Sequence, residues 1–231
     1  MEHPINRNRI AYPQIKVCGL TQPDEALACA EAGVHALGLV FYPPSPRFVS
    51  DATAREITEA LPDHVVPVGV FVDESYDRVI QLTTHCRLKA VQLHGNESPE
   101  MVDQLMREDV RVIKALFHGK RPTLEQADRF RPTAYLAECS GGILPGGNAR
   151  VWDWRLARSI ERHVPVILAG GLTPDNVNEA LTAALPDAVD VSSGVEFSPG
   201  RKDMNKVRAF IRAVVECAGS MNPQHKRSLF E

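Results

Sequence analysis

Cys18 and Glu138 are the two side chains whose type and position suit proton transfer. Each directly follows a short apolar run, at 14–17 and at 134–137. A helix N-terminus lowers the pKa of a nearby thiol, and the segment 21–24 is typical of a helix start, so we expect Cys18 to act as a general base near neutral pH. Moving a proton along a small molecule requires groups on both sides of it, and Glu138 is the matching acid.

Each of these two residues also has a simpler interpretation. Cysteine is among the most buried residue types, so Cys18 alone is more typical of a packed thiol. Glu138 alone is equally typical of a salt-bridged carboxylate at the rim of a fold. The cysteines are odd in number and form no CxxC pair, which argues against a disulfide framework or a thiolate zinc site, and we expect no bound metal. The five cysteines are Cys18, Cys29, Cys86, Cys139 and Cys217.

Two glycine-bearing segments follow the apolar runs 164–169 and 188–191 and predict a phosphate site. Glycine lets backbone amides approach phosphate oxygens, and serine hydroxyls add further donors. A Gly-Gly pair alone is an ordinary turn marker, but two such segments at the last two runs favour phosphate binding. The predicted phosphate contacts are Gly170, Gly171, Ser192, Ser193 and Gly194.

Four further polar residues are candidate substrate contacts: Arg47, Gln92, His94 and Asp190. Arg47 lies in a proline-stiffened segment, PPSPR at 43–47, and its planar fork suits a bidentate contact with a carboxylate. A single loop arginine is more often a solvated charge. Asp190 is expected to contact substrate, and sharing the acid role with Glu138 is its alternative.

Eight strand-length apolar runs alternate with helical patterns, which is typical of βαβ units around a parallel sheet. The runs are 14–17, 36–40, 65–70, 89–93, 110–115, 134–137, 164–169 and 188–191. Eight such units predict a single-domain (β/α)8 TIM barrel, whose strand ends would bring the candidate side chains together. The alternative, a doubly wound open sheet, would place a glycine-rich fingerprint after the first strand, where this chain has CGLT at 18–21.

Between the strands, Thr21, Ser98 and Thr173 are predicted to cap helices, because each precedes a proline and an acidic residue. Helical spacing covers 24–32, 52–61, 76–85, 154–161, 176–185 and 204–215. We therefore expect an N-terminal tail at 1–13, a barrel domain at 14–217 and a C-terminal tail at 218–231. The last segment loses periodicity and is expected to fray.

Composition limits the classes of function. Lys plus Arg number 26 against 29 Asp plus Glu, and the net charge of −3 supplies no overall attraction for nucleic acid. No apolar run approaches the length of about 18 residues needed to span a membrane. The first residues lack a signal-peptide pattern, so we expect a cytoplasmic protein.

Several of these residues lie in motifs that resemble the phosphoribosylanthranilate isomerase family. Those motifs follow the family's order over nearly the whole chain, and the first and last are specific when found together. They are KVCGLT at 16–21, GLVF at 38–41 with SPR at 45–47, VFV at 70–72, VQLHG at 91–95, PGG at 145–147 with DW at 153–154, AGGL at 169–172 with NV at 176–177, and DVSSGVE at 190–196.

The resemblance implies an Amadori rearrangement of N-(5-phosphoribosyl)anthranilate in tryptophan biosynthesis, with no metal or organic cofactor. It implies that Cys18 is the general base, that Arg47 meets the anthranilate carboxylate, and that phosphate lies on Gly171, Ser193 and their neighbours. The expected partner is a phosphorylated small molecule, and a neighbouring pathway enzyme stays open as a second.

Two departures from the family pattern lie together. The family acid is an aspartate in an LLD pattern, where this chain has LAE ending at Glu138, and the GGTGK loop is replaced by GGNAR at 146–150. Glutamate keeps the carboxyl group but reaches about one methylene further. Two alternatives therefore stay open: a related barrel enzyme acting on another ribose phosphate conjugate, and a non-catalytic barrel that binds a phosphorylated ligand.

Overall fold

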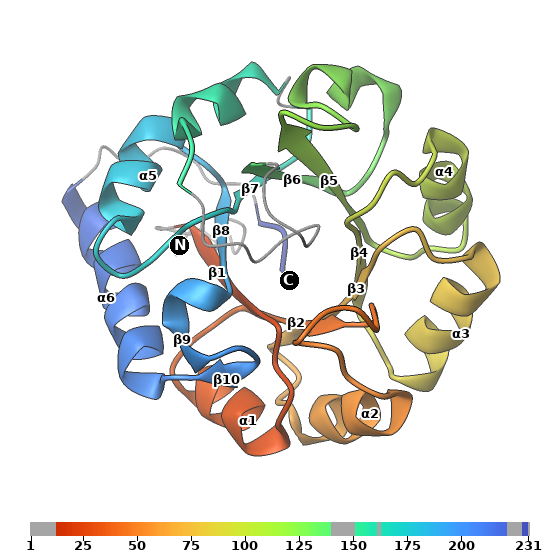
Figure 1. Ribbon diagram of the computed structural model, residues 1–231, viewed down its shortest axis with the longest axis horizontal. Helices are drawn as coiled ribbons and strands as arrows, with labels where there is room; N and C mark the ends of the chain where they lie inside the picture. The colour runs from red at the N-terminus through yellow and green to blue at the C-terminus, as the bar shows by residue number, and fades with distance from the viewer. Residues whose placement is uncertain (1–12, 140–150, 161–162, 221–227, 231) are drawn as a thin grey trace, which may run out of the picture.

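The computed structural model describes residues 13–139, 151–160, 163–220 and 228–230. Eight parallel strands pair in chain order, and β1 also pairs with β8, so the sheet closes into a barrel. The predicted (β/α)8 architecture is confirmed. Figure 1 shows the strands as an inner ring and the helices around it. The strands are β1 (Gln14–Cys18), β2 (Ala36–Val40), β3 (Val66–Phe71), β4 (Ala90–Leu93), β5 (Val112–His118), β6 (Ala134–Cys139), β7 (Val166–Leu168) and β8 (Ala188–Val191).

Five of the six segments predicted to be helical are α-helices, and the described segments after β5 and β6 are short 3-10 helices. The segment predicted as a helix at 154–161 is one of these, η2 (Trp154–Ser159). The helices are α1 (Pro23–Glu31), α2 (Asp51–Ala60), α3 (Tyr76–His85), α4 (Pro99–Arg107), η1 (Leu124–Arg129), α5 (Val177–Ala184), η3 (Ser193–Val195) and α6 (Met204–Ser220). No helix in the described part of the chain is long and apolar enough to cross a membrane.

Of the three predicted helix caps, only Ser98 is one: its hydroxyl oxygen accepts a hydrogen bond from the Met101 amide. The predictions for Thr21 and Thr173 were wrong. The Thr21 hydroxyl donates to the Gly200 carbonyl oxygen at 2.6 Å. Gly200 lies in the turn between β9 (Glu196–Ser198) and β10 (Arg201–Lys202), an antiparallel hairpin that follows β8. Thr21 therefore holds this hairpin against the loop after β1.

Strand alternation separates two apolar layers. Ile15 and Val17 of β1 belong to the large cluster that joins the strands to the helices. A second cluster fills the barrel interior near the strand starts and includes Ala36, Val66 and Ala188. We call this end of the interior the floor, and the opposite end, where the strands finish, the mouth.

Two described stretches of the C-terminal segment, 218–220 and 228–230, differ from the frayed tail that we expected. Helix α6 continues to Ser220, past the predicted boundary at 217. Leu229 and Phe230 are buried in the interior cluster at the floor. Their backbone amides donate to the Gln14 Oε1 atom at 2.6 and 3.0 Å, and the segment lies in the middle of the ring in Figure 1. The division of the chain into a barrel domain and two tails stays a prediction.

Candidate active site

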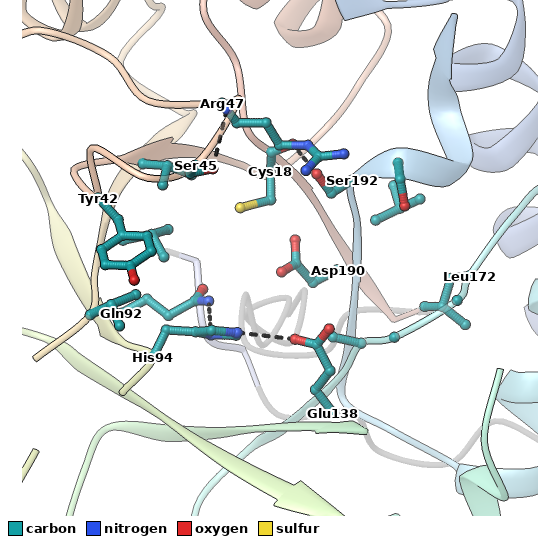
Figure 2. Close-up of a pocket in the computed structure, with 18 residues that line it drawn as sticks. Cys18, Tyr42, Ser45, Arg47, Gln92, His94, Glu138, Leu172, Asp190 and Ser192 are labelled. Atoms are coloured by element: carbon teal, nitrogen blue, oxygen red, sulfur yellow. Dashed lines mark hydrogen bonds and ion pairs between the residues drawn. The ribbon is translucent and has the colours of Figure 1, made fainter. Parts of the chain in front are cut away.

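One pocket opens at the mouth of the barrel, and the predicted side chains converge on it (Figure 2). The predicted residues that line it are Cys18, Arg47, Gln92, His94, Glu138, Gly170, Gly171, Asp190, Ser192 and Ser193. Gly194, predicted to contact phosphate, does not line the pocket. A Cβ atom at Gly194 would lie 1.9 Å from the Leu172 carbonyl oxygen, so this glycine lets the loops after β7 and β8 approach each other.

Cys18 is held at the end of β1 by its backbone. Its carbonyl oxygen accepts hydrogen bonds from the Ser192 hydroxyl at 3.0 Å and from the Lys202 ammonium group at 2.6 Å. The thiol fits against β2 because residue 38 is glycine: a Cβ atom there would lie 2.5 Å from Sγ. Figure 2 shows the sulfur directed into the pocket.

The expectation of a lowered pKa for the Cys18 thiol was wrong. Helix α1 begins only at Pro23, and burial raises the pKa of the Cys18 thiol above its ordinary value. Lys16 and Lys202 oppose this rise, whereas Asp190 adds to it. Desolvation thus outweighs the opposing charges of the two ammonium groups.

Glu138 faces the pocket from β6, opposite Cys18 (Figure 2). Its Oε2 atom lies 3.1 Å from His94 Nε2, and Gln92 Nε2 lies 2.9 Å from His94 Nδ1. An amide nitrogen donates, so in this arrangement Nδ1 accepts, and Nε2 carries the hydrogen that it donates to the Glu138 carboxylate. This chain of bonds holds one carboxylate oxygen and leaves Oε1 for a ligand.

Asp190 pairs with Lys16, a residue that the sequence argument did not single out. Lys16 Nζ lies 2.9 Å from Asp190 Oδ2, and Lys16 is fully buried. The second carboxylate oxygen, Oδ1, is buried without a hydrogen-bond partner among the described residues. Desolvation raises the pKa of Asp190, although the charge and the hydrogen bond of Lys16 oppose this rise.

Arg47 lies in the pocket wall, but its fork already holds a carboxylate. Its Nε and Nη2 atoms donate to the two oxygens of Glu196 at 2.9 and 2.7 Å. Lys202 Nζ donates to the same carboxylate at 2.7 Å. The side-on face of the guanidinium group is therefore occupied, and a ligand would meet its end-on face, with Nη1 and the second Nη2 hydrogen.

The sequence argument also did not single out Glu196 and Lys202. Glu196 was visible in the DVSSGVE segment, but nothing in the sequence indicated that hairpin β9–β10 folds back over the mouth to pair it with Arg47 and Lys202. Burial raises the pKa of Glu196, and the hydrogen bonds from Arg47 and the charge of Lys202 more than reverse this, so its pKa is lowered overall.

The Gly-Gly pair in the loop after β7 forms a bend that brings its backbone to the pocket. Gly170 and Gly171 adopt positive φ angles of 91° and 69°, which favour glycine. Trp152 and Trp154 donate from their indole nitrogens to the carbonyl oxygens of Ala169 and Gly170, at 2.9 and 3.3 Å. These hydrogen bonds orient the two carbonyl groups toward the tryptophan side chains.

The two serines predicted to contact phosphate, Ser192 and Ser193, differ in what they can offer a ligand. The Ser192 hydroxyl hydrogen goes to the Cys18 carbonyl, so Ser192 can offer a ligand its backbone amide but not the hydroxyl donor that we expected. Ser193 lines the pocket at the start of η3. In the described part of the chain, no group of three His, Cys, Asp or Glu side chains is arranged to hold a metal ion.

Comparison with known proteins decides the family. Residues 15–213 match the family model described as N-(5'phosphoribosyl)anthranilate (PRA) isomerase. The chain belongs to this isomerase family. The N-(5'-phosphoribosyl)anthranilate isomerase of Desulfatibacillum aliphaticivorans is 49% identical over 211 residues, which cover 91% of this chain and 97% of the relative. The enzyme of the same name from Syntrophus aciditrophicus (strain SB) is 41% identical, over 93% of this chain and 92% of the relative.

Solved structures of the isomerase family agree with the barrel. Phosphoribosyl anthranilate isomerase from Thermotoga maritima superposes with a TM-score of 0.81 at 36% identity, over 88% of this chain and 99% of that chain. A phosphoribosyl anthranilate isomerase in complex with reduced 1-(o-carboxyphenylamino)-1-deoxyribulose 5-phosphate matches with a TM-score of 0.76 at 36% identity, over 88% and 99%. The resemblance drawn from the motifs is confirmed.

Proposed function

We propose that this protein converts N-(5'-phosphoribosyl)anthranilate into 1-(2-carboxyphenylamino)-1-deoxyribulose 5-phosphate, the Amadori rearrangement of tryptophan biosynthesis. Membership of the isomerase family supports the substrate and the reaction. One observation carries the mechanism: Cys18 and Glu138 face the same pocket from opposite walls. A base and an acid on two sides of one ligand are what successive proton transfers require.

The reaction begins at the ring oxygen of the ribose. Glu138, in its protonated form, donates a proton to this oxygen as the C1–O bond breaks. The lone pair of the anilino nitrogen forms a C1=N double bond, and Glu138 becomes a carboxylate. The thiolate of Cys18 then removes the proton from C2. The C2–H electrons form a C1=C2 bond, and the C1=N π electrons return to nitrogen.

The resulting enolamine becomes the product by a second proton shift. Its C2 hydroxyl group loses a proton, C1 gains one, and the C1=C2 bond is replaced by a C2=O bond. The substrate then has no net gain or loss of protons, and transfer of one proton from the Cys18 thiol to the Glu138 carboxylate through solvent restores both side chains. Neither step requires a change of oxidation state at a protein group.

The remaining pocket residues are assigned either to substrate contacts or to the orientation of Glu138. Arg47 would meet the anthranilate carboxylate with its end-on face, since Glu196 holds the other. Asp190 Oδ1, a buried acceptor with no partner in the described chain, suits a ribose hydroxyl group. The phosphate would lie on the backbone of Gly170 and Gly171 and on Ser193. Gln92 and His94 act through Glu138, which they orient.

Replacement of the base tests the mechanism. Cys18→Ala should lower kcat by about 10²–10⁴-fold in a substrate-fluorescence assay, because that is the usual contribution of a general base. Cys29→Ala is the matched control: it removes another buried thiol, in α1 and outside the pocket, and should leave kcat within a few-fold. If Cys18→Ala kept the wild-type kcat, Cys18 would not be the base.

The substrate is tested separately by complementation. Wild-type protein should restore growth of a tryptophan auxotroph that lacks the isomerase. Well-folded protein that binds the substrate without restoring growth would instead favour a non-catalytic barrel. Turnover of another ribose phosphate conjugate would favour a related enzyme. A cytoplasmic location is proposed with this function, because the pathway's small phosphorylated intermediates would be made and used there.

A further inference from the structure

Three residues of β1 point in succession into the barrel interior. Side chains of a strand alternate, so Gln14, Lys16 and Cys18 share the face opposite to Ile15 and Val17. Gln14 holds the C-terminal segment at the floor, and Cys18 lines the pocket at the mouth. Lys16 lies between them. Its ammonium group is thus placed in the layer directly beneath the reacting thiol.

Lys16 is anchored there by Asp190. The two residues are register partners on β1 and β8, and their charged atoms lie 2.9 Å apart. The Lys16 side chain is fully buried, and that of Asp190 is 8% exposed. A buried lysine without a partner would lose its proton, so the carboxylate keeps the ammonium group charged in the interior. Figure 2 shows the Asp190 carboxyl group between Cys18 and Glu138.

We propose that Lys16 is a positioning residue for the reaction, whose ammonium group, held by Asp190, stabilises the thiolate of Cys18 from below. This role rests on the proposed function of Cys18 as the base. A thiolate in a desolvated pocket needs a nearby cation, since burial alone favours the neutral thiol. Lys16 is a cation that reaches Cys18 from the interior, on the same strand.

The two other cations near Cys18, Lys202 and Arg47, both form an ion pair with Glu196. Lys202 donates hydrogen bonds to the backbone carbonyl of Cys18 and to Glu196, and Arg47 also donates to Glu196. Asp190 faces Cys18 from β8 and opposes ionisation of the thiol. The remaining titratable side chains of the same pocket are Tyr42, His94 and Glu138.

The pKa values agree with this geometry. Desolvation raises the pKa of Cys18, and the charge of Lys16 is the largest influence that opposes it. Burial by itself would lower the pKa of Lys16, but the attraction of Asp190 and Cys18 reverses this and raises it. Thiol and ammonium group are therefore coupled: each favours the charged form of the other.

The test is the alkylation of Cys18 by iodoacetamide as a function of pH, followed by mass spectrometry of the peptide that contains it. The thiolate is the reacting form, so the rate reports its population without requiring isomerase activity. Lys16→Met should move the midpoint to higher pH and slow alkylation at pH 8 by about tenfold, which corresponds to about one pKa unit. The rising limb of kcat/KM against pH should shift in the same direction.

Two further variants separate this role from a loss of packing. Lys114→Met removes another fully buried lysine, on β5, whose partner is Glu97 at 2.7 Å, and should leave the alkylation midpoint of Cys18 unchanged. Lys16→Gln removes the charge but keeps a side chain that can donate a hydrogen bond to Asp190, so its alkylation midpoint should move to higher pH as in Lys16→Met. This variant still tests the coupling if Lys16→Met does not fold.

Three results would overturn the proposal. One is an unchanged midpoint in folded Lys16→Met, and another is an equal shift in Lys16→Met and Lys114→Met. The third is an unchanged midpoint in folded Lys16→Gln. If the alkylation shifts occur but Cys18→Ala keeps full activity, the coupling stands and the assignment of Cys18 as the base fails.

Discussion

The two ends of one barrel interior are filled with opposite chemistry. At the mouth, a thiol, two carboxylates and a histidine surround a pocket, with Lys16–Asp190 and Arg47–Glu196 as buried ion pairs. At the floor, Leu229 and Phe230 pack among small apolar side chains. Buried ion pairs contribute little net stability, whereas buried apolar area contributes directly. The same strands therefore support reactivity at one end and stability at the other.

The largest expected effect at the mouth is on catalysis. Glu138→Gln removes the proton donor but keeps the size of the side chain and a hydrogen bond to His94. We expect kcat to fall by about 10²–10⁴-fold, because a general acid contributes that much. The melting temperature should change little. Steady-state fluorescence kinetics and thermal unfolding of the same preparation measure both.

Glu138→Asp is the informative partner of this variant, since aspartate is the residue of the family pattern. It keeps the carboxyl group but withdraws it by one methylene. A misplacement of about 1 Å costs up to about 10²-fold in rate, so Glu138→Asp should lose less than Glu138→Gln. Equal losses would mean that the carboxyl group is not the donor.

The next effect at the mouth is on stability. Arg47→Met leaves the Glu196 carboxylate buried, with Lys202 as its remaining cation among the described residues. Removing one partner of a buried pair costs about 3–5 kcal/mol, and urea denaturation should show a loss of this order. Arg55→Met is the control: the Arg55–Glu59 pair on α2 is 39% and 43% exposed, and such pairs contribute about 0.3–0.5 kcal/mol. Similar losses would mean that burial does not matter here.

The architecture and most pocket residues could be predicted because they depend on local pattern. Strand-length apolar runs placed Cys18, Glu138 and Asp190 at strand ends, and the barrel closure then brought them together. The pKa direction of Cys18 could not be predicted in this way. It depends on how much water the neighbouring strands exclude, and this desolvation exceeds the opposing charges of Lys16 and Lys202.

The missed residues have partners far away along the chain. Lys16 and Asp190 are separated by 174 positions, and Arg47 and Glu196 by 149. A lysine within an apolar strand run indicates burial but not which carboxylate neutralises it. The floor is similar, since Gln14 and Leu229 are 215 positions apart and the last residues carry no periodic pattern. The family match ends at residue 213, so it does not include this contact.

A smaller effect is expected at the floor, and it should be on stability alone. Phe230→Ala should lower the free energy of unfolding by about 1.5–3 kcal/mol, the transfer free energy of one buried aromatic side chain. The kcat should stay unchanged, since the pocket lies at the other end of the interior. Urea denaturation and steady-state kinetics of Phe230→Ala check both, and Val215→Ala, at a half-exposed side chain of α6, is the control.

The smallest expected effect is a pH dependence of the free energy of unfolding, which arises from Glu196 at the mouth. The pKa of Glu196 is lowered in the folded protein, so its carboxylate stabilises the fold above the unfolded-state pKa of about 4.3. That contribution disappears as the pH falls through the folded-state pKa. Between pH 5 and pH 3, wild-type protein should therefore lose more stability than Glu196→Gln, as measured by urea midpoints at each pH. Parallel pH curves for the two proteins would show that Arg47 and Lys202 do not favour the ionised form of Glu196 over its protonated form.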